Sequence, residues 1–204
     1  MSTVPRLLSA SIGAVLIAAA GGGAWFIDRL PGNDYLRQIA NDKTTSLAIK
    51  VAMVEGFYFE SSNQLRTKPY VAPEGNLTVC NGLTAATIGP IDRNRQYTPA
   101  ECYELERNLY VQYEASLRRL HPNWDAANPL QQASNMDMVH NVGLPTYRAS
   151  TMRRLFDAGK FIESCEQNPR WVYATINGVK KRLAGLVVRR DANESVCKAE
   201  ALQV

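Results

Sequence analysis

The strongest constraint on this chain is a run of 21 consecutive uncharged residues near its start, from Leu7 to Ile27. At about 1.5 Å per residue, a helix of this length just spans a bilayer core of about 30 Å. Ala and Gly dominate the run, so its hydrophobicity is marginal. We expect an uncleaved membrane segment. Two alternatives stay open: a signal peptide cleaved after residues 18–20 (Ala-Ala-Ala), and a buried helix of a soluble fold.

All four cysteines of the chain follow this run, at Cys80, Cys102, Cys165 and Cys197. None of them forms a CxxC pair, and the chain has only two histidines, so the sequence does not predict a zinc site. Two disulfides formed in an oxidising compartment fit the pattern, and they favour export of the part after the run. The alternative is four reduced, buried thiols in a cytosolic protein.

Length and charge limit the classes of function. The 204 residues are 46% hydrophobic, enough for one domain with a hydrophobic core. The net charge of +4 suits an anionic polymer or a membrane surface, but no dense Lys/Arg run indicates nucleic acid. No internal repeat, Gly-rich phosphate loop or nucleophile elbow is present, and no cofactor is expected.

The first helix after the linker is predicted to end beside a carboxylate. Apolar residues recur at helical spacing in Leu47–Val54, with Ser46 as N-cap and Gly56 as the stop. Glu55 would then lie in the last turn, where the negative end of the helix dipole disfavours its ionised form. A raised pKa suits a general acid, whereas the simpler interpretation is a surface glutamate.

The remaining segments indicate an α+β fold. Residues 28–45 look like a linker with a possible short helix, and residues 57–68 look like a loop. Residues 70–90 are rich in β-formers between turn signals such as Asn81-Gly82, which predicts a small antiparallel hairpin or three-stranded sheet. Further helices are predicted over 99–120, 129–142, 150–159, 161–167 and 182–202, the first opened by a Thr98–Glu101 capping box.

Three segments together resemble the phage-type lysozymes, glycoside hydrolase family 24. They are KPYVAPEGNLTVCNGLT (68–84), NVGLPTYRASTMRRLFDAG (141–159) and RWVYATINGVKKRLAGLVVRRDANESVC (170–197). The N-terminal run and the four cysteines resemble one subgroup, the signal-arrest-release endolysins of lambdoid phages. This resemblance implies a lysozyme-like α+β fold, in which a small β subdomain and a mostly helical lobe enclose a cleft. An N-terminal hydrophobic helix precedes the fold. The expected boundaries are 1–30 for the signal anchor, 31–45 for the linker and 46–204 for the catalytic domain.

The resemblance also implies roles for individual residues. Glu55 takes the place of the family's general acid, and Thr78 that of the threonine that orients the attacking water. The family's second carboxylate falls at Ala72, which has no proton chemistry, and Glu74 is a possible substitute. No metal ligand is implied.

The implied function is a muramidase that hydrolyses the β-1,4 bond between N-acetylmuramic acid and N-acetylglucosamine in peptidoglycan for host lysis. Alternatives are a weak or inactive wall-binding relative, and a lytic transglycosylase-like enzyme that uses Glu55 alone. We expect a monomer with peptidoglycan as partner, held at the host inner membrane by residues 7–27 and later released to the periplasm.

The disulfides are expected to join cysteines that lie in neighbouring elements along the chain. Four cysteines allow three pairings. The pairs Cys80–Cys102 and Cys165–Cys197 connect the sheet to the first long helix and the last two helices to each other.

Overall fold

The computed structural model of the protein describes residues 33–61, 64–72, 75–176 and 178–199. These residues form two compact units, which divide between Glu114 and Ala115, within helix α5 (Pro99–Leu120). We call them the N-terminal unit and the C-terminal unit. The expected membrane segment 7–27 and the candidate carboxylate Glu74 lie outside the described residues. Within the described ranges, no helix is both long enough and apolar enough to cross a membrane.

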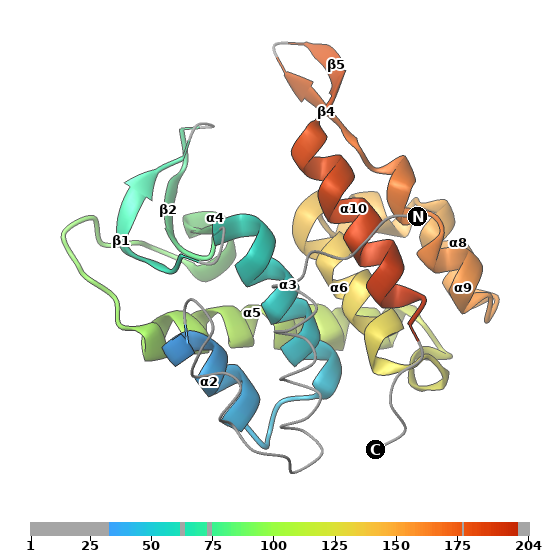
Figure 1. The fold of residues 1–204 in the computed structure, drawn as a ribbon, viewed down its shortest axis with the longest axis horizontal. Helices are drawn as coiled ribbons and strands as arrows, with labels where there is room; N and C mark the ends of the chain where they lie inside the picture. Colours follow the sequence, from blue (N-terminus) through green and yellow to red (C-terminus); the bar gives the residue numbers. More distant parts are fainter. Residues whose placement is uncertain (1–32, 62–63, 73–74, 177, 200–204) are drawn as a thin grey trace. The chain divides into compact units, whose positions relative to one another are not determined.

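The N-terminal unit combines helices with a small antiparallel sheet, as the sequence predicts. In chain order it holds α2 (Asn33–Asn41), α3 (Leu47–Ser61), β1 (Arg66–Val71), β2 (Leu77–Cys80), β3 (Leu83–Thr84), α4 (Ala85–Ile88) and the first part of α5 (Figure 1). The sheet has the order β1-β2-β3, with Tyr70 paired to Thr78 and Thr78 paired to Thr84. Because paired residues share a face, these three side chains form one row across the sheet.

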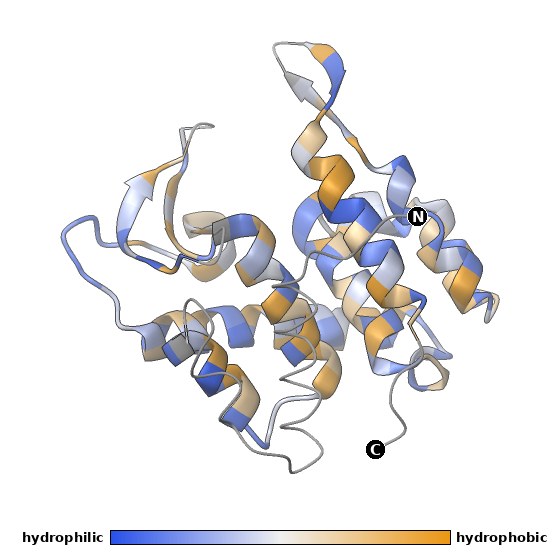
Figure 2. Cartoon of the chain, viewed as in Figure 1, coloured by the Kyte–Doolittle hydropathy of each residue, from blue (hydrophilic) through white to orange (hydrophobic). Residues whose placement is uncertain are grey.

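Helix α3 is longer than predicted, and this changes the position of Glu55. The helix continues past Gly56 to Ser61, so Glu55 is not in its last turn. Residues 48–57 are all buried, and Figure 2 shows apolar residues along this helix. The ring of Phe57 lies 5.2 Å from that of Tyr35 in α2. Glycine inside a helix costs about 0.5–1 kcal/mol, which this packing outweighs.

One further segment differs from the sequence prediction, and another agrees with it. Residues 57–68, predicted as a loop, contain the end of α3 and the start of β1. The expected linker holds α2, which confirms the short helix, and its Tyr35, Leu36 and Ile39 are buried. This helix therefore contributes to the core of the N-terminal unit.

The C-terminal unit is mostly helical. After the end of α5 it holds η2 (Trp124–Ala126), α6 (Pro129–Val142), α7 (Leu144–Arg148), α8 (Thr151–Asp157), α9 (Phe161–Cys165), η3 (Asn168–Arg170), β4 (Tyr173–Ile176), β5 (Val179–Arg182) and α10 (Ala184–Cys197). The β4–β5 hairpin, which projects from the helices of this unit in Figure 1, was not predicted. Gly178, with φ of +77°, lies in its turn, and the predicted start of the last helix at Arg182 is wrong.

A buried ionic cluster lies between α6 and α10. Asp137 of α6 accepts hydrogen bonds from Arg189 at 2.5 Å and Arg190 at 2.9 Å, and from the amide of Asn193. Burial alone raises the pKa of the Asp137 carboxyl, but the two guanidinium charges outweigh burial and lower this pKa to about 2. This cluster joins the two helices by charge as well as by packing.

The predicted Thr98–Glu101 capping box and both predicted disulfides are confirmed. The backbone amides of Thr98 and Glu101 each bond to the other residue's side chain, at 2.8 and 3.2 Å. Asn128 caps α6, and Ser150 caps α8. Cys80–Cys102 links β2 to α5, and Cys165–Cys197 links α9 to α10.

Candidate active site

A pocket of about 450 Å³ lies in the N-terminal unit, over one face of the small sheet. Its walls come from the end of α3, from all three strands and from the turns between them. The lining residues are Glu60, Arg66, Tyr70, Ala72, Asn76, Thr78, Gly82 and Thr84. The paired row Tyr70, Thr78 and Thr84 lies within this lining, so the sheet register builds one wall.

Glu60 contributes a carboxyl group to this pocket. It lies in the last turn of α3 and is half-buried, so its carboxyl can meet both water and a ligand. Its side chain packs on Gly82, where an added Cβ would lie 3.6 Å from the Glu60 Cβ and from Oε2. Gly82 has φ of +78°, a conformation that favours glycine. The β2–β3 turn therefore sets one side of the space that Glu60 occupies.

The sheet supplies polar groups at fixed positions. Thr78 is buried, lines the pocket, and donates its hydroxyl to the backbone oxygen of Asn76 at 3.1 Å. The guanidinium of Arg66 lies 4.4 Å from the centre of the Tyr70 ring. Because a threonine hydroxyl also accepts hydrogen bonds, Thr78 can accept one from a water molecule in the pocket.

The side chain at the end of β1 brings no acid to the pocket. Ala72 lines it, with its backbone amide bonded to Asn76 at 2.9 Å. Glu60 is the single carboxylate in the pocket lining among the residues that the structure describes. Glu74, the possible substitute carboxylate, is not among them.

Glu55, the acid that the sequence favours, does not line this pocket. Its side chain is fully buried, and it precedes Glu60 by five residues in the same helix. At about 100° per residue, the two side chains leave the helix some 140° apart. The local pattern placed the end of this helix at Gly56, whereas α3 ends at Ser61.

Sequence reasoning also missed a second buried carboxyl of this unit, Glu106. It lies on α5, one turn after Cys102, and only 1% of it is exposed. Its pKa is raised to about 8, first because of burial and also because of the charge of Glu60, against hydrogen bonds from Tyr35 and Asn81. An acidic residue within the apolar stripe of a helix was the signal that could have found it.

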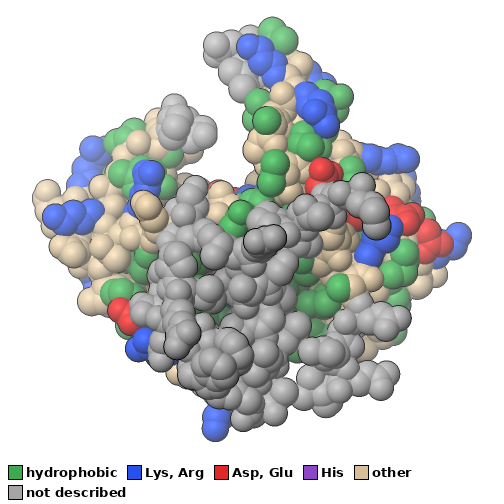
Figure 3. Space-filling view, in the orientation of Figure 1, with side chains coloured by type: hydrophobic (Ala, Val, Ile, Leu, Met, Phe, Trp, Pro, Cys, Tyr) green, Lys and Arg blue, Asp and Glu red, His purple; other side chains and the backbone are tan. Residues whose placement is uncertain are grey.

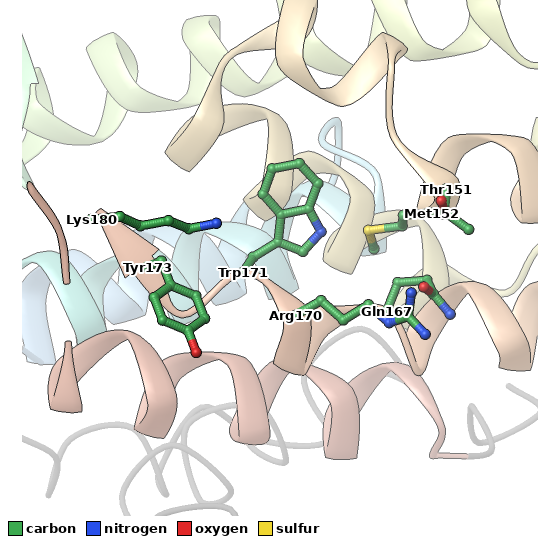
Figure 4. A pocket seen from close by; sticks show the side chains of 7 residues that line it. All are labelled: Thr151, Met152, Gln167, Arg170, Trp171, Tyr173 and Lys180. Atoms are coloured by element: carbon green, nitrogen blue, oxygen red, sulfur yellow. The ribbon is translucent and has the colours of Figure 1, made fainter. Parts of the chain in front are cut away.

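A second pocket, of about 330 Å³, lies in the C-terminal unit, and its charged lining residues are both cations. It is lined by Thr151, Met152, Gln167, Arg170, Trp171, Tyr173 and Lys180. Figure 4 shows Lys180 reaching toward the Trp171 indole, with Arg170 and Gln167 beyond that ring. The Lys180 ammonium lies 5.0 Å from the centre of the Tyr173 ring. Cations beside aromatic rings suit a ligand with carboxylates and apolar ring faces.

The cationic character extends along the β4–β5 hairpin. All of β5 is exposed and reads Val-Lys-Lys-Arg, and Figure 3 shows Lys and Arg side chains gathered on this hairpin. Tyr173 and Val179 are also exposed, at 50% and 56%. This surface can therefore meet an anionic partner.

The fold and the sequence were compared with known proteins. The family model described as phage lysozyme matches residues 60–193, so the match begins at Glu60. The SAR-endolysin of Bacteriophage PS119 is 34% identical over 134 residues, covering 65% of this chain and 74% of that protein. The SAR-endolysin of Escherichia phage Mu is 26% identical over 197 residues, covering 96% and 94%.

Two solved structures have a similar fold. The active form of the P1 phage endolysin Lyz has a TM-score of 0.63 at 16% identity, covering 81% of this chain and 92% of that chain. The muramidase domain of SpmX from Asticaccaulis excentricus has a TM-score of 0.62 at 19% identity, covering 78% of this chain and 100% of that chain. The predicted lysozyme-like α+β class is therefore confirmed.

Proposed function

Because this chain belongs to the phage lysozyme family and is a peptidoglycan-degrading endolysin of the glycosidase type, we propose that it cleaves the β-1,4 bond between N-acetylmuramic acid and N-acetylglucosamine. The observation that carries the proposal is the pocket in which Glu60 and Thr78 line one space over the sheet. Glycoside cleavage needs an acid that protonates the leaving oxygen, and a half-buried carboxyl beside a polar wall meets that need.

Glu60 is the acid in this proposal. It lines the pocket and is the first residue of the family match, whereas Glu55 is fully buried and precedes the match. Glu55 remains the competing assignment from the sequence. Thr78 holds the attacking water, because its hydroxyl lies in the pocket wall.

Because Ala72 replaces the family's second carboxylate, two ways of cleaving the bond are considered. In hydrolysis, water adds its hydroxyl to C1 of the muramic acid, the leaving oxygen takes a proton, and a second carboxylate normally activates the water. In transglycosylation, the O6 hydroxyl of the same sugar attacks C1 and loses its proton, so no water is consumed. A pocket with one described carboxylate favours this second candidate more than a paired site would.

Product analysis of purified peptidoglycan after digestion tests both candidates. Mass spectrometry distinguishes a reducing N-acetylmuramic acid end from a 1,6-anhydro end, which weighs one water less. Reducing ends support the hydrolase, and anhydro ends support the transglycosylase. Absence of either product from folded protein would favour the wall-binding relative. Ala72→Asp should raise the hydrolysis rate if only the second carboxylate is missing.

The proposed setting is the host inner membrane, followed by the periplasm. Relatives named SAR-endolysin and two disulfides, which form in oxidising compartments, support export. We propose that residues 7–27 hold the chain at the membrane until release. Replacing Gly21, Gly22 and Gly23 with Leu should keep the protein in the membrane fraction and delay lysis. Normal release, or a mature N-terminus after Ala20, would contradict this.

A further inference from the structure

Glu106 is a buried carboxyl that the proposed reaction does not use. It extends from α5 into the interior of the N-terminal unit, and 1% of it is exposed. A ligand in the pocket over the sheet cannot touch a group so buried, and Glu106 does not line that pocket. It therefore cannot replace the carboxylate missing at Ala72, and its role must act through another residue.

The contacts of Glu106 lead directly to the β2–β3 turn. The side-chain amide of Asn81 donates a hydrogen bond of 2.6 Å to Oε2 of Glu106, and the hydroxyl of Tyr35 donates to the same oxygen. Asn81 is itself fully buried and forms the turn together with Gly82. The first residue of the turn is thus fixed to α5 from inside the unit.

The other carboxyl oxygen of Glu106 lies against helix α3. A Cβ added to Gly56 would lie 3.2 Å from Oε1 of Glu106 and 3.0 Å from the hydroxyl of Tyr110. These distances are tighter than ordinary contacts, so a larger residue at this position would push the carboxyl away. Gly56 therefore allows α3 and Glu106 to approach closely, which explains a glycine in the middle of a helix.

On its other side, the β2–β3 turn contacts Glu60. The Glu60 side chain packs on Gly82, the residue that follows Asn81. A continuous series of contacts thus runs from Glu106 through Asn81 and Gly82 to the proposed acid. Catalytic groups must be held within about 0.5 Å of their working geometry, so the anchor of this turn affects catalysis.

We propose that Glu106 is a positioning residue, which holds the Asn81–Gly82 turn against Glu60 and so fixes where the acid acts. This inference rests on the proposed role of Glu60. It assigns a function to a carboxyl that would otherwise only cost burial energy.

The electrostatics of Glu106 also supports a coupling between this carboxyl and Glu60. The polar groups that face Glu106 are Tyr35 from α2, Glu60 from α3, Asn81 from the turn and Tyr110 from its own helix. Burial and the charge of Glu60 raise the pKa of Glu106 to about 8, so the carboxyl is mainly protonated at neutral pH. A protonated Glu106 accepts from Asn81 and places no negative charge beside Glu60.

Steady-state kinetics on solubilised peptidoglycan provides the first test. Glu106→Leu, which removes the acceptor of Asn81, should lower kcat by about 10- to 100-fold while KM stays unchanged. Asn81→Ala breaks the same link from the other end and should give a loss of the same size. The double variant should be no worse than either single one. Glu104→Gln, an exposed carboxyl on the same helix, is the matched control and should leave kcat unchanged.

Glu106→Gln keeps the acceptor oxygen and imitates the protonated acid, so it should retain kcat near pH 6. Full kcat in folded Glu106→Leu and Asn81→Ala would overturn the inference. An equal loss in Glu106→Gln and Glu106→Leu would do so too, because the acceptor oxygen would then not matter.

A second test needs no turnover, so it is independent of the proposed reaction. NMR spectra from pH 6 to 9 should show an inflection near pH 8, from Glu106, in both the Gly82 amide and the Glu60 carboxyl carbon. The inflection should vanish in Glu106→Gln and persist in Glu104→Gln. If wild type shows none, or if Glu106→Gln retains it, Glu106 does not act on this turn, whatever the enzyme's products are.

Discussion

Each unit of the protein has a buried helical carboxyl group with a shifted pKa, and these two groups, Asp137 and Glu106, are in opposite states. Asp137 in the C-terminal unit is 0% exposed and has a pKa lowered to about 2. Glu106 in the N-terminal unit is 1% exposed and has a pKa raised to about 8. Burial raises the pKa of both, so burial alone does not separate them.

The charges of the groups that contact Asp137 and Glu106 account for the difference between their pKa values. Asp137 faces the two guanidinium groups of Arg189 and Arg190, which stabilise its ionised form. Glu106 faces a hydroxyl and an amide, and the charge of Glu60 raises its pKa. The Asp137 cluster is therefore a permanent ion cluster that joins helices. The Glu106 carboxyl instead holds a proton that it can lose near physiological pH.

The largest expected difference between the two carboxyls is the unfolding free energy that is lost when each is replaced by its amide. Asp137→Asn removes the negative charge that the buried guanidinium groups of Arg189 and Arg190 contact, and it should cost about 3–5 kcal/mol of unfolding free energy. Glu106→Gln replaces a mainly protonated acid by its neutral isostere and should cost less than about 1 kcal/mol at pH 6. Urea unfolding of both variants measures this. Equal losses would show that the partners do not distinguish the two sites.

Removing each disulfide separately sharpens the comparison, because each lies beside one carboxyl cluster. Cys80 precedes Asn81 and Cys102 lies one turn before Glu106, whereas Cys197 lies one turn after Asn193. Loss of either disulfide, with sequence separations of 22 and 32, should cost about 3–4 kcal/mol.

Only removal of the first disulfide should also lower kcat, because only that one fixes the strand that enters the turn. Double Cys→Ala variants, assayed at a temperature where both are folded, test this. A kcat loss confined to the Cys165/Cys197 variant would contradict the account.

The pH dependence of stability should have opposite signs for the two groups. The folded state favours ionised Asp137, so its contribution is present above its usual pKa of 3.8 and is lost as pH falls toward 2. The folded state favours protonated Glu106, so its contribution is complete below 4.5 and is lost as pH rises toward 8. Relative to wild type, Glu106→Gln should therefore gain stability between pH 5 and 8.5. Unfolding at a series of pH values checks this, and a constant difference between the two proteins would refute it.

The smallest expected effect is that of Tyr35→Phe. It removes one hydrogen bond to Glu106 and should cost about 0.5–1.5 kcal/mol. Because that bond favours the ionised form, its loss should raise the pKa of Glu106 further and leave Asp137 unaffected. Carbon-detected NMR titration of both carboxyls distinguishes this from a global change, in which both pKa values would move.

Local patterns predicted much of this fold. Both disulfides join consecutive cysteines of the chain, and the Thr98–Glu101 capping box and the turn at Asn81-Gly82 follow from residue types at short spacing. These features depend on neighbours along the chain, which a sequence displays directly.

The predicted end of α3 is wrong because tertiary contacts outweigh local preference there. Gly56 is a helix stop by propensity, but the packing of Phe57 on Tyr35 carries α3 on to Ser61. The place of Glu60 in the pocket depends on its contact with Gly82, and the state of Glu106 depends on a residue 71 positions earlier. No short-range pattern contains such contacts.

The most direct test of the account compares Glu60→Gln with Glu55→Gln in peptidoglycan turnover, with thermal unfolding to confirm that both variants are folded. Removing a general acid costs about 10²- to 10⁴-fold in rate. The account predicts a loss of this size in kcat/KM for Glu60→Gln, and a change of only a few-fold for Glu55→Gln. Turnover that survives in Glu60→Gln but disappears in folded Glu55→Gln would return the acid to Glu55 and contradict the site described for the N-terminal unit.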